Sequence, residues 1–331
     1  MWRAAMPLLA VAIAACGGMD EGAGEKVRVH VPRGASMSQV ADSLAAHDLI
    51  NSAFAFRVYA RVKRVAGSMK AGTYEFREGV GWDRILDDIA NGRVINDRLV
   101  IPEGWDIRRI APMLAEVSGM SADSVEAMLF DSAMVARLGV PGPTLEGYLF
   151  PATYTFPVNA PLDTLVAQIV ARYREVWTPE RRARADSIGL SEREVVTLAS
   201  IVEAEARRRE ELRLISAVYH NRLRRNYPLQ ADPTVQYALG ERQARLLYAH
   251  IDSSADNPYN TYRRPGLPPG PIGSPGEAAI DAALNPDTVS HFFFVARPDG
   301  SHIFTRTFAE HQRAVAQARR LRREAEQEAG D

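Results

Sequence analysis

The stretch Leu198-Ala199-Ser200-Ile201-Val202-Glu203-Ala204-Glu205-Ala206 carries two acids into an apolar run, and the rest of the chain is organised around it. Ser191 and Glu194 precede this run at the spacing of a capping box, which predicts that a helix begins there. Helical periodicity then gives the helix one buried stripe. The predicted stripe consists of Val195, Ala199, Val202 and Ala206.

The two acids lie at the two edges of that stripe. A carboxyl at such an edge is partly removed from water, which disfavours its charged form and raises its pKa, as a general acid near neutral pH requires. The periodicity does not choose between Glu203 and Glu205. It is also compatible with two solvated acids that pair with the arginines at 207–209.

Further segments of polar and turn-forming residues follow downstream. They are Tyr219-His220-Asn221-Arg222-Leu223, Leu229-Gln230-Ala231-Asp232-Pro233-Thr234-Val235, Tyr259-Asn260-Thr261-Tyr262, Gly266-Leu267-Pro268-Pro269-Gly270-Pro271-Ile272 and Pro275-Gly276. With the 199–203 run ahead of them, they closely resemble the endolytic murein transglycosylase family, also called YceG-like. The resemblance covers most of the chain from about Val27, and several motifs in one order are more specific than any single motif.

The resemblance implies that Glu203 is the catalytic acid, because it ends the 199–203 run. Glu205 matches a second acidic position two residues on, which implies a supporting role. The downstream motifs imply a substrate-binding set. Together with Glu205 this set comprises Asn221, Arg222, Gln230, Asp232, Thr234, Tyr259, Asn260, Thr261 and Tyr262.

Some of these residues also have a purely structural interpretation. Asp232 before proline is typical of a turn, so an extended turn is expected there, whereas the resemblance places the segment against a cleft where Gln230 binds an N-acetyl group. Residues 259–262 combine aromatic faces with an amide, which suits sugar rings, or else form a loop whose tyrosines fill the core. Residues 266–276 are expected to form a rigid, non-helical loop.

A hairpin is predicted near the end of the chain. Residues 292–296 and 301–304 have the composition of two strands joined by a Pro-Asp-Gly turn. His302 on the second strand matches a family histidine, and the favoured interpretation is a structural hydrogen-bonder.

Resemblance to a lytic transglycosylase implies chemistry with one carboxylate, whereas ordinary glycosidases use two. Glu203 would protonate the oxygen linking N-acetylmuramic acid to N-acetylglucosamine. It would then accept the proton of the muramic C6 hydroxyl, which attacks C1 and closes a 1,6-anhydro ring at a high effective molarity. The implied role is to terminate nascent glycan strands. Two alternatives stay open: a hydrolytic muramidase in which Asp232 activates water, and a peptidoglycan-binding lipoprotein without catalysis.

Composition argues against other classes of protein. The 331-residue chain is 46% apolar and 24% charged, with a formal net charge of -1, which gives no basis for nucleic-acid binding. The arginines of 313–323 are interleaved with Ala and are followed by Glu324 and Glu326, as on a solvated helix face. No His, Cys or Asp spacing is typical of a metal site and no glycine motif is typical of a phosphate site, so we expect no metal and no cofactor.

The first residues predict export. Residues 7–15 form an apolar run too short to span a bilayer, and Ile13-Ala14-Ala15-Cys16 resembles the lipobox of bacterial lipoproteins. We expect a signal peptide at 1–15, a lipid on Cys16 and a flexible tether over 16–26. The family resemblance instead implies a transmembrane helix as the anchor. In that case the start codon is misplaced and the helix is encoded upstream of it. Either anchor holds the chain on the cytoplasmic membrane, facing the periplasm or cell exterior, where glycan strands and, by resemblance, penicillin-binding synthases are its partners.

An internal repeat precedes the catalytic region. One motif set, Val31-Pro32, Gly34, Val40-Ala41 and Leu44-Ala45, recurs at one constant offset as Ile101-Pro102, Gly104, Ile110-Ala111 and Leu114-Ala115. Each copy should fold as strand, helix, helix, strand, which resembles a LysM module. Whether the copies bind glycan or only position the catalytic part stays open.

The predicted fold is α+β. LysM-like βααβ modules over 27–97 and 98–160 precede a mixed α+β catalytic domain over 161–331, which carries a glycan-binding cleft.

Overall fold

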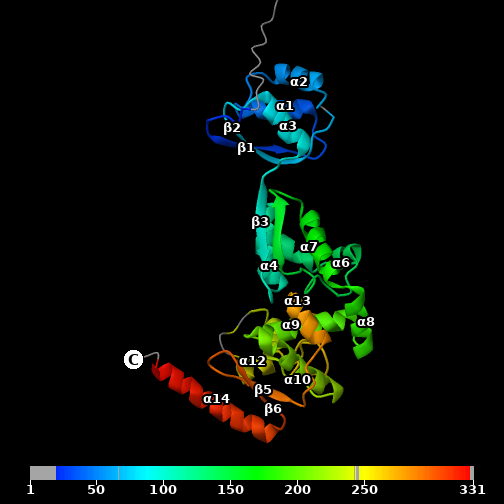
Figure 1. Cartoon of the computed structure of the whole chain (residues 1–331), viewed down its shortest axis with the longest axis vertical. Helices are drawn as coiled ribbons and strands as arrows, with labels where there is room; N and C mark the ends of the chain where they lie inside the picture. Colours follow the sequence, from blue (N-terminus) through cyan, green and yellow to red (C-terminus); the bar gives the residue numbers. More distant parts are fainter. Residues whose placement is uncertain (1–19, 66, 242, 244–245, 329–331) are drawn as a thin grey trace, which may run out of the picture. The chain divides into compact units, whose positions relative to one another are not determined.

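The computed structural model describes residues 20–65, 67–241, 243 and 246–328, so the predicted signal peptide and Cys16 lie outside the described part. By its internal contacts the chain divides into two compact units. Unit 1 comprises residues 1–97 and 155–160, and unit 2 comprises 98–154 and 161–331. The fold is mixed α+β, as predicted (Figure 1). No helix in the described ranges is long and apolar enough to cross a membrane.

Unit 1 has a two-stranded antiparallel sheet with its own hydrophobic core. Val29 lies opposite Tyr74 in the register, and both are fully buried. Alternation along each strand places one face inward, where it packs on Leu44, Phe56 and Ile85 from the helices. The elements are β1 (Lys26–Val31), α1 (Met37–Ala46), α2 (Ala53–Val62), β2 (Gly72–Arg77) and α3 (Trp82–Asn91).

The chain then repeats this order of elements. The second copy consists of β3 (Asn96–Ile101), α4 (Ile107–Ser118), α5 (Ala122–Leu129), α6 (Ser132–Leu138), β4 (Ala152–Pro157) and α7 (Leu162–Val176). Strand β3 pairs with β4, as β1 pairs with β2. Tyr74 and Tyr154 take matching places, since each hydroxyl donates over 2.6 Å to the carbonyl four residues earlier. The predicted strand, helix, helix, strand order is confirmed in both copies, with α6 added in the second.

Helix α9 is central to the remaining elements of unit 2. Helices α8, α10, α11 and α13 all contact it, and residues 195–202 are all buried. A helix that is buried all round is a core helix. The buried surface of α9 is therefore wider than the single stripe that the sequence predicted. The elements are α8 (Pro179–Ile188), α9 (Glu192–Glu205), α10 (Leu212–Arg224), α11 (Asp232–Leu239), α12 (Tyr248–Ser253), α13 (Glu277–Leu284), β5 (Phe293–Ala296), β6 (His302–Thr305) and α14 (Phe308–Glu328).

The prediction of an extended turn at Asp232 is wrong. Asp232 is the first residue of α11, and Pro233 stands in its first turn. Proline suits that place, because its fixed φ is helical and the N–H that it lacks would have no partner within the helix. The hydroxyl of Thr234 donates to the Ala231 carbonyl over 2.7 Å and closes the start of the helix.

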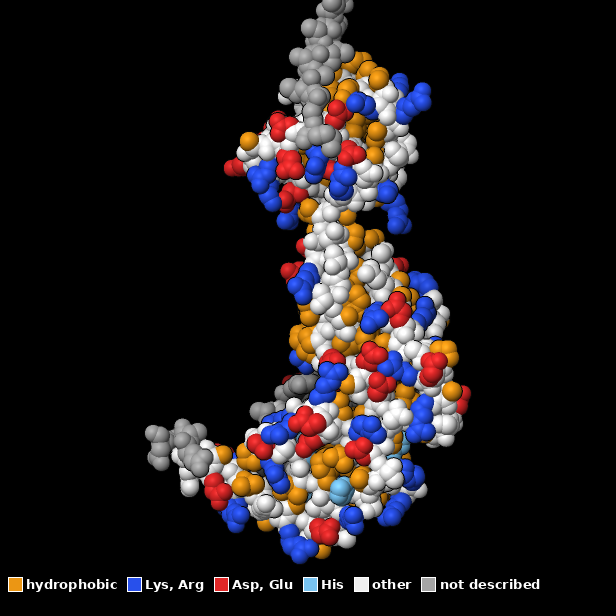
Figure 2. Space-filling view, in the orientation of Figure 1, with side chains coloured by type: hydrophobic (Ala, Val, Ile, Leu, Met, Phe, Trp, Pro, Cys, Tyr) orange, Lys and Arg blue, Asp and Glu red, His pale blue; other side chains and the backbone are white. Residues whose placement is uncertain are grey.

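Other local predictions are confirmed. The capping box at Ser191 begins α9, residues 266–276 are non-helical, and β5 and β6 form the antiparallel hairpin. Helix α14 contains the arginine-rich tail, and most of its residues are exposed. Acidic and basic side chains are interspersed over the visible face (Figure 2).

Candidate active site

The last turn of α9 brings Glu203 and Glu205 to the edge of the helical core. The helix ends at Glu205, and Ala206 caps it with an extended backbone. The C-terminal end of a helix carries partial negative charge, which disfavours the charged form of a carboxyl there. The position at the end of the helix therefore raises the pKa of the two carboxyls, and burial raises it as well.

Two backbone segments of unit 2 converge on this turn. The hydroxyl of Ser200 accepts the Ile272 N–H over 3.0 Å, which fixes the Gly- and Pro-rich loop to α9. The same loop pairs with the turn before α4, since Gly104 N–H donates to Ser274 O and Ser274 N–H donates to Trp105 O, both over 2.8 Å. A Cβ on Gly104 would lie 3.6 Å from the Cγ of Glu203, so this turn directly borders the acid.

Glu203 is partly buried and bonded to a backbone amide. Its Oε2 accepts the N–H of Gly276, the N-cap of α13, over 3.0 Å. Burial raises the pKa of Glu203, and the charge of Glu103 acts in the same direction, while the Gly276 N–H and Arg209 oppose the shift. A Cβ on Gly276 would come within 2.0 Å of the Glu103 carboxylate, so a side chain at this position would displace Glu103.

Glu205 has different neighbours. Its Oε1 accepts the hydroxyl of Tyr219 over 2.9 Å. Burial raises the pKa of Glu205 to about 7, the charge of Asp232 adds to the rise, and Tyr219 and Arg222 oppose it. Asp232 in turn accepts the hydroxyl of Tyr262.

A cavity of about 450 Å³ opens beside the end of α9. Glu205 and Asp232 line it, together with Asp106, Arg108 and Arg207. Glu203 does not line this cavity, but its neighbour Gly104 does. A cavity of this size, lined by carboxyl groups and by guanidinium groups, suits a polar ligand.

The other residues of the predicted binding set lie in the surrounding framework. Arg222 is buried and donates to the carbonyls of Phe292 and Leu229. Asn221 donates to the carbonyls of Val289 and His291 over 3.0 and 2.7 Å. Both side chains therefore hold α10 against neighbouring backbone, and contact with substrate stays a prediction for them.

The start of α11 and the loop around Asn260 hold each other. The hydroxyls of Thr234 and Thr261 lie 2.8 Å apart and are buried. Gln230 donates its N–H to the Thr261 carbonyl over 3.0 Å, and Asn260 is fully buried with its amide on the Ile251 carbonyl. The loop therefore centres on Asn260, while Tyr259 packs on Tyr237, with ring centroids 4.8 Å apart.

Comparison with known proteins identifies the family. The sequence profile of the YceG-like family matches residues 29–317. The chain belongs to this family. An endolytic murein transglycosylase of Bacillus subtilis (strain 168) is 34% identical over 305 residues, which cover 87% of this chain and 83% of that protein. One of Streptococcus pneumoniae serotype 2 is 28% identical, covering 90% of this chain but 59% of the longer relative.

A solved structure agrees with this assignment. The 2.6 Å crystal structure of a YceG-like protein from Listeria monocytogenes has a TM-score of 0.60 and 31% identity to this chain. The match covers 88% of this chain and 99% of that one.

The YceG-like fold also places Glu146 behind the cavity, a residue to which the sequence assigned no role. Glu146 is 1% exposed, and both of its oxygens accept the Ile107 N–H at the start of α4, each over 3.2 Å. Burial raises its pKa to about 8, against the opposing hydrogen bonds of Ile107 and of Tyr237, which lines the cavity. The signal that the sequence offered for Glu146 was its position as the one acid in the apolar segment 145–150.

His302 hydrogen-bonds a buried acid, which agrees with the structural role predicted for it. Its Nδ1 lies 2.7 Å from Oε2 of Glu211, and its N–H donates to the other oxygen over 3.0 Å. Both residues are buried, and His302 forms part of the cavity wall. Within the described residues, no grouping of His, Cys, Asp and Glu has the arrangement of a metal site.

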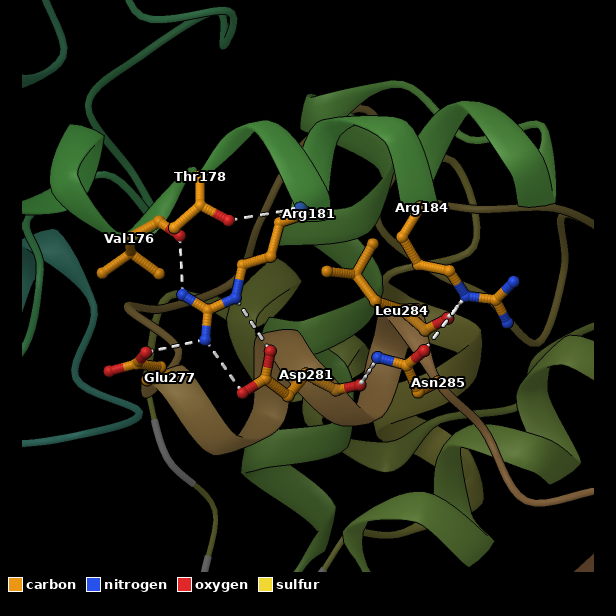
Figure 3. Close-up of polar contacts among 8 residues, drawn as sticks. All are labelled: Val176, Thr178, Arg181, Arg184, Glu277, Asp281, Leu284 and Asn285. Carbon is orange, nitrogen blue, oxygen red and sulfur yellow. Dashed lines mark hydrogen bonds and ion pairs between the residues drawn. The ribbon is translucent and has the colours of Figure 1, made fainter.

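An arginine clamp fixes the helix that presents the Gly276 amide. Arg181 on α8 donates to both oxygens of Asp281 over 2.8 and 2.9 Å and to Glu277 over 2.7 Å (Figure 3). Its remaining nitrogen donates to the Val176 carbonyl. Since Glu277 follows Gly276 directly, the clamp secures the first turn of α13 beside Glu203.

Proposed function

We propose that this chain is an endolytic murein transglycosylase that cleaves the bond between N-acetylmuramic acid and N-acetylglucosamine without water. One observation carries the proposal. In a chain 34% identical to a relative of that name, Glu203 lies in the last turn of the central helix, with a raised pKa and a backbone N–H on its carboxylate.

We assign both proton transfers to Glu203. Burial keeps its carboxyl protonated to higher pH than an ordinary glutamate, so it can donate to the glycosidic oxygen. The resulting carboxylate retains the Gly276 N–H, which favours the charged form while it accepts the proton of the muramic C6 hydroxyl. C1 thereby exchanges its bond to the leaving sugar for a bond to its own C6 oxygen.

The cavity beside α9 is the glycan-binding cleft in this proposal. Glu205 and Asp232 offer acceptors to sugar hydroxyls, and Arg108 and Arg207 offer donors to acetamido or lactyl oxygens. Both βααβ copies act as LysM-like modules that either bind glycan or position the cleft.

We further propose an envelope location with a lipid on Cys16. The lipobox-like residues 13–16 support this anchor, and peptidoglycan as substrate requires that unit 2 lie outside the cytoplasm. Peptidoglycan synthases are the proposed partners, by resemblance to the family.

The chemical nature of the product tests the reaction. Purified uncrosslinked glycan should yield fragments that end in 1,6-anhydro-N-acetylmuramic acid, one water lighter than hydrolysis products and resistant to borohydride. Anhydro ends formed within long strands, rather than disaccharides released from one end, would support endolytic cutting. Mass spectrometry after digestion in ¹⁸O water provides the measurement. Reducing ends that carry solvent oxygen would overturn the proposal in favour of hydrolysis with Asp232 as the base.

A further inference from the structure

Helix α2 of unit 1 exposes an apolar stripe. Phe54, Val58 and Val62 follow one another at four-residue spacing and are 70%, 46% and 74% exposed. Residues four apart lie on one face of a helix, so the three side chains form a continuous row. The opposite face is fully used, since Phe56 and Ala60 are completely buried in the core of unit 1. The stripe is thus not needed to hold α2 in place.

The sequence around this stripe is strongly basic. Residues 49–74 contain five Lys or Arg side chains and no Asp or Glu. Acids elsewhere in unit 1 neutralise two of them, because Arg57 lies 3.4 Å from Asp42 and Lys63 lies 2.9 Å from Asp83. Within the described part of the chain Arg61 and Arg64 have no ion-pair partner, and both are exposed.

The basic side chains border the apolar row directly. Arg57 and Arg61 are one turn apart, and the guanidinium of Arg57 lies 6.0 Å from the ring centre of Phe54. Figure 2 shows apolar side chains gathered at the surface over α2, with basic side chains beside them. An apolar row with cations along its edge matches the interface of a bilayer, where acyl chains lie beneath anionic headgroups.

We infer that α2 rests on an anionic lipid surface, with the row of Phe54, Val58 and Val62 in the interface and Arg61 and Arg64 at the headgroups. A glycan strand is a poorer match, because the row carries neither the amides nor the hydroxyls that sugar recognition needs. Three apolar side chains give only weak, reversible binding, so the contact depends on the negative charge of the lipid. The inference depends neither on the catalytic assignment nor on the predicted N-terminal anchor.

A local probe on the full chain tests this contact. Cys16→Ser leaves no native thiol, so Val58→Cys can be labelled uniquely with an environment-sensitive fluorophore. Vesicles of phosphatidylglycerol and phosphatidylcholine should shift the emission to the blue and increase its intensity, whereas vesicles of phosphatidylcholine alone should not. The same label at Ser124→Cys, an exposed site on α5, is the control and should not respond.

Two sets of variants make the test decisive. The double variant Arg61→Gln, Arg64→Gln, read out by the label at position 58, should bind anionic vesicles roughly tenfold more weakly or worse. Each basic residue near the lipid surface contributes about 1 kcal/mol of attraction. Phe54→Asp with Val62→Asp should abolish it, and an unchanged circular dichroism spectrum would show that these exposed sites leave the fold intact. The inference fails if position 58 is silent on anionic vesicles, responds equally to uncharged ones, or responds to glycan strands or a protein partner instead.

Discussion

Glu203 and Glu205, two residues apart at the end of α9, have different neighbours. Glu203 is bonded to the Gly276 amide, whereas Glu205 is bonded to the Tyr219 hydroxyl and lines the cavity. Burial raises the pKa of both carboxyls. A raised pKa therefore does not distinguish the acid from its neighbour, and the family motif makes the assignment to Glu203.

Substitution separates the two carboxyls. Glu203→Gln keeps the size of the side chain but removes the proton to be donated, so the rate of anhydro-product formation should fall by several orders of magnitude, since each positioned acid or base role contributes about 10²–10⁴-fold. Glu205→Gln should lose less, because it retains an acceptor for the Tyr219 hydroxyl. Rates on purified glycan, with thermal unfolding as the control, provide the comparison. Equal losses, or a greater loss at Glu205, would transfer the catalytic role to the carboxyl that lines the cavity.

At the scale of elements, one repeated turn has two different roles. In the first copy nothing lies within 4 Å of a Cβ built on Gly34, whereas in the second a Cβ on Gly104 would meet Glu203. Both glycines have positive φ, which explains why the residue recurs in both turns. The repeat supplies the turn, and only the second copy uses it as a wall of the site.

The clamp between α8 and α13 should affect both stability and activity. Arg181→Ala removes three hydrogen bonds to carboxylates, and because those acids are half exposed we expect a loss of about 1–2 kcal/mol in the free energy of unfolding. Activity should fall further than stability alone explains, since α13 presents the Gly276 amide to Glu203. Urea unfolding and product formation are the two measurements.

A matched control is available on the surface of the same unit. Arg137→Ala breaks the solvent-exposed pair with Asp163, which should cost less than about 1 kcal/mol and leave activity unchanged. A similar loss of activity in both variants would show that the clamp does not position the site.

At the scale of the whole molecule, the proposed lipid on Cys16 can be tested by substitution. Cys16→Ser should abolish metabolic labelling by a radioactive fatty acid and release mature protein into the soluble envelope fraction. Fractionation and labelling of the two forms provide the check. A variant that stays on the membrane would place the main anchor elsewhere, most simply in an upstream transmembrane helix.

Local signals in the sequence determined the type and order of many of the helices and strands. The Ser191 capping box, the recurrence of Pro-x-Gly before an apolar helix and the alternation in the C-terminal hairpin each depend on residues a few positions apart. These signals were sufficient for the strand, helix, helix, strand order of both copies, but not for α3 or α6. The motif order was sufficient for the family, since it depends on sequence alone.

Only the tertiary structure decided how these parts meet. The Gly276 amide reaches Glu203 across 73 residues, and the Arg222 side chain reaches Phe292 across 70. No local pattern encodes such distances, so the sequence could not show that Arg222 is buried in the framework or that Glu146 lies behind the cavity. The start of α11 at Asp232 was also undecided locally, because Asp-Pro begins turns and helices alike. In the structure the Thr234 hydroxyl in the first turn of this helix contacts that of Thr261, 27 residues away.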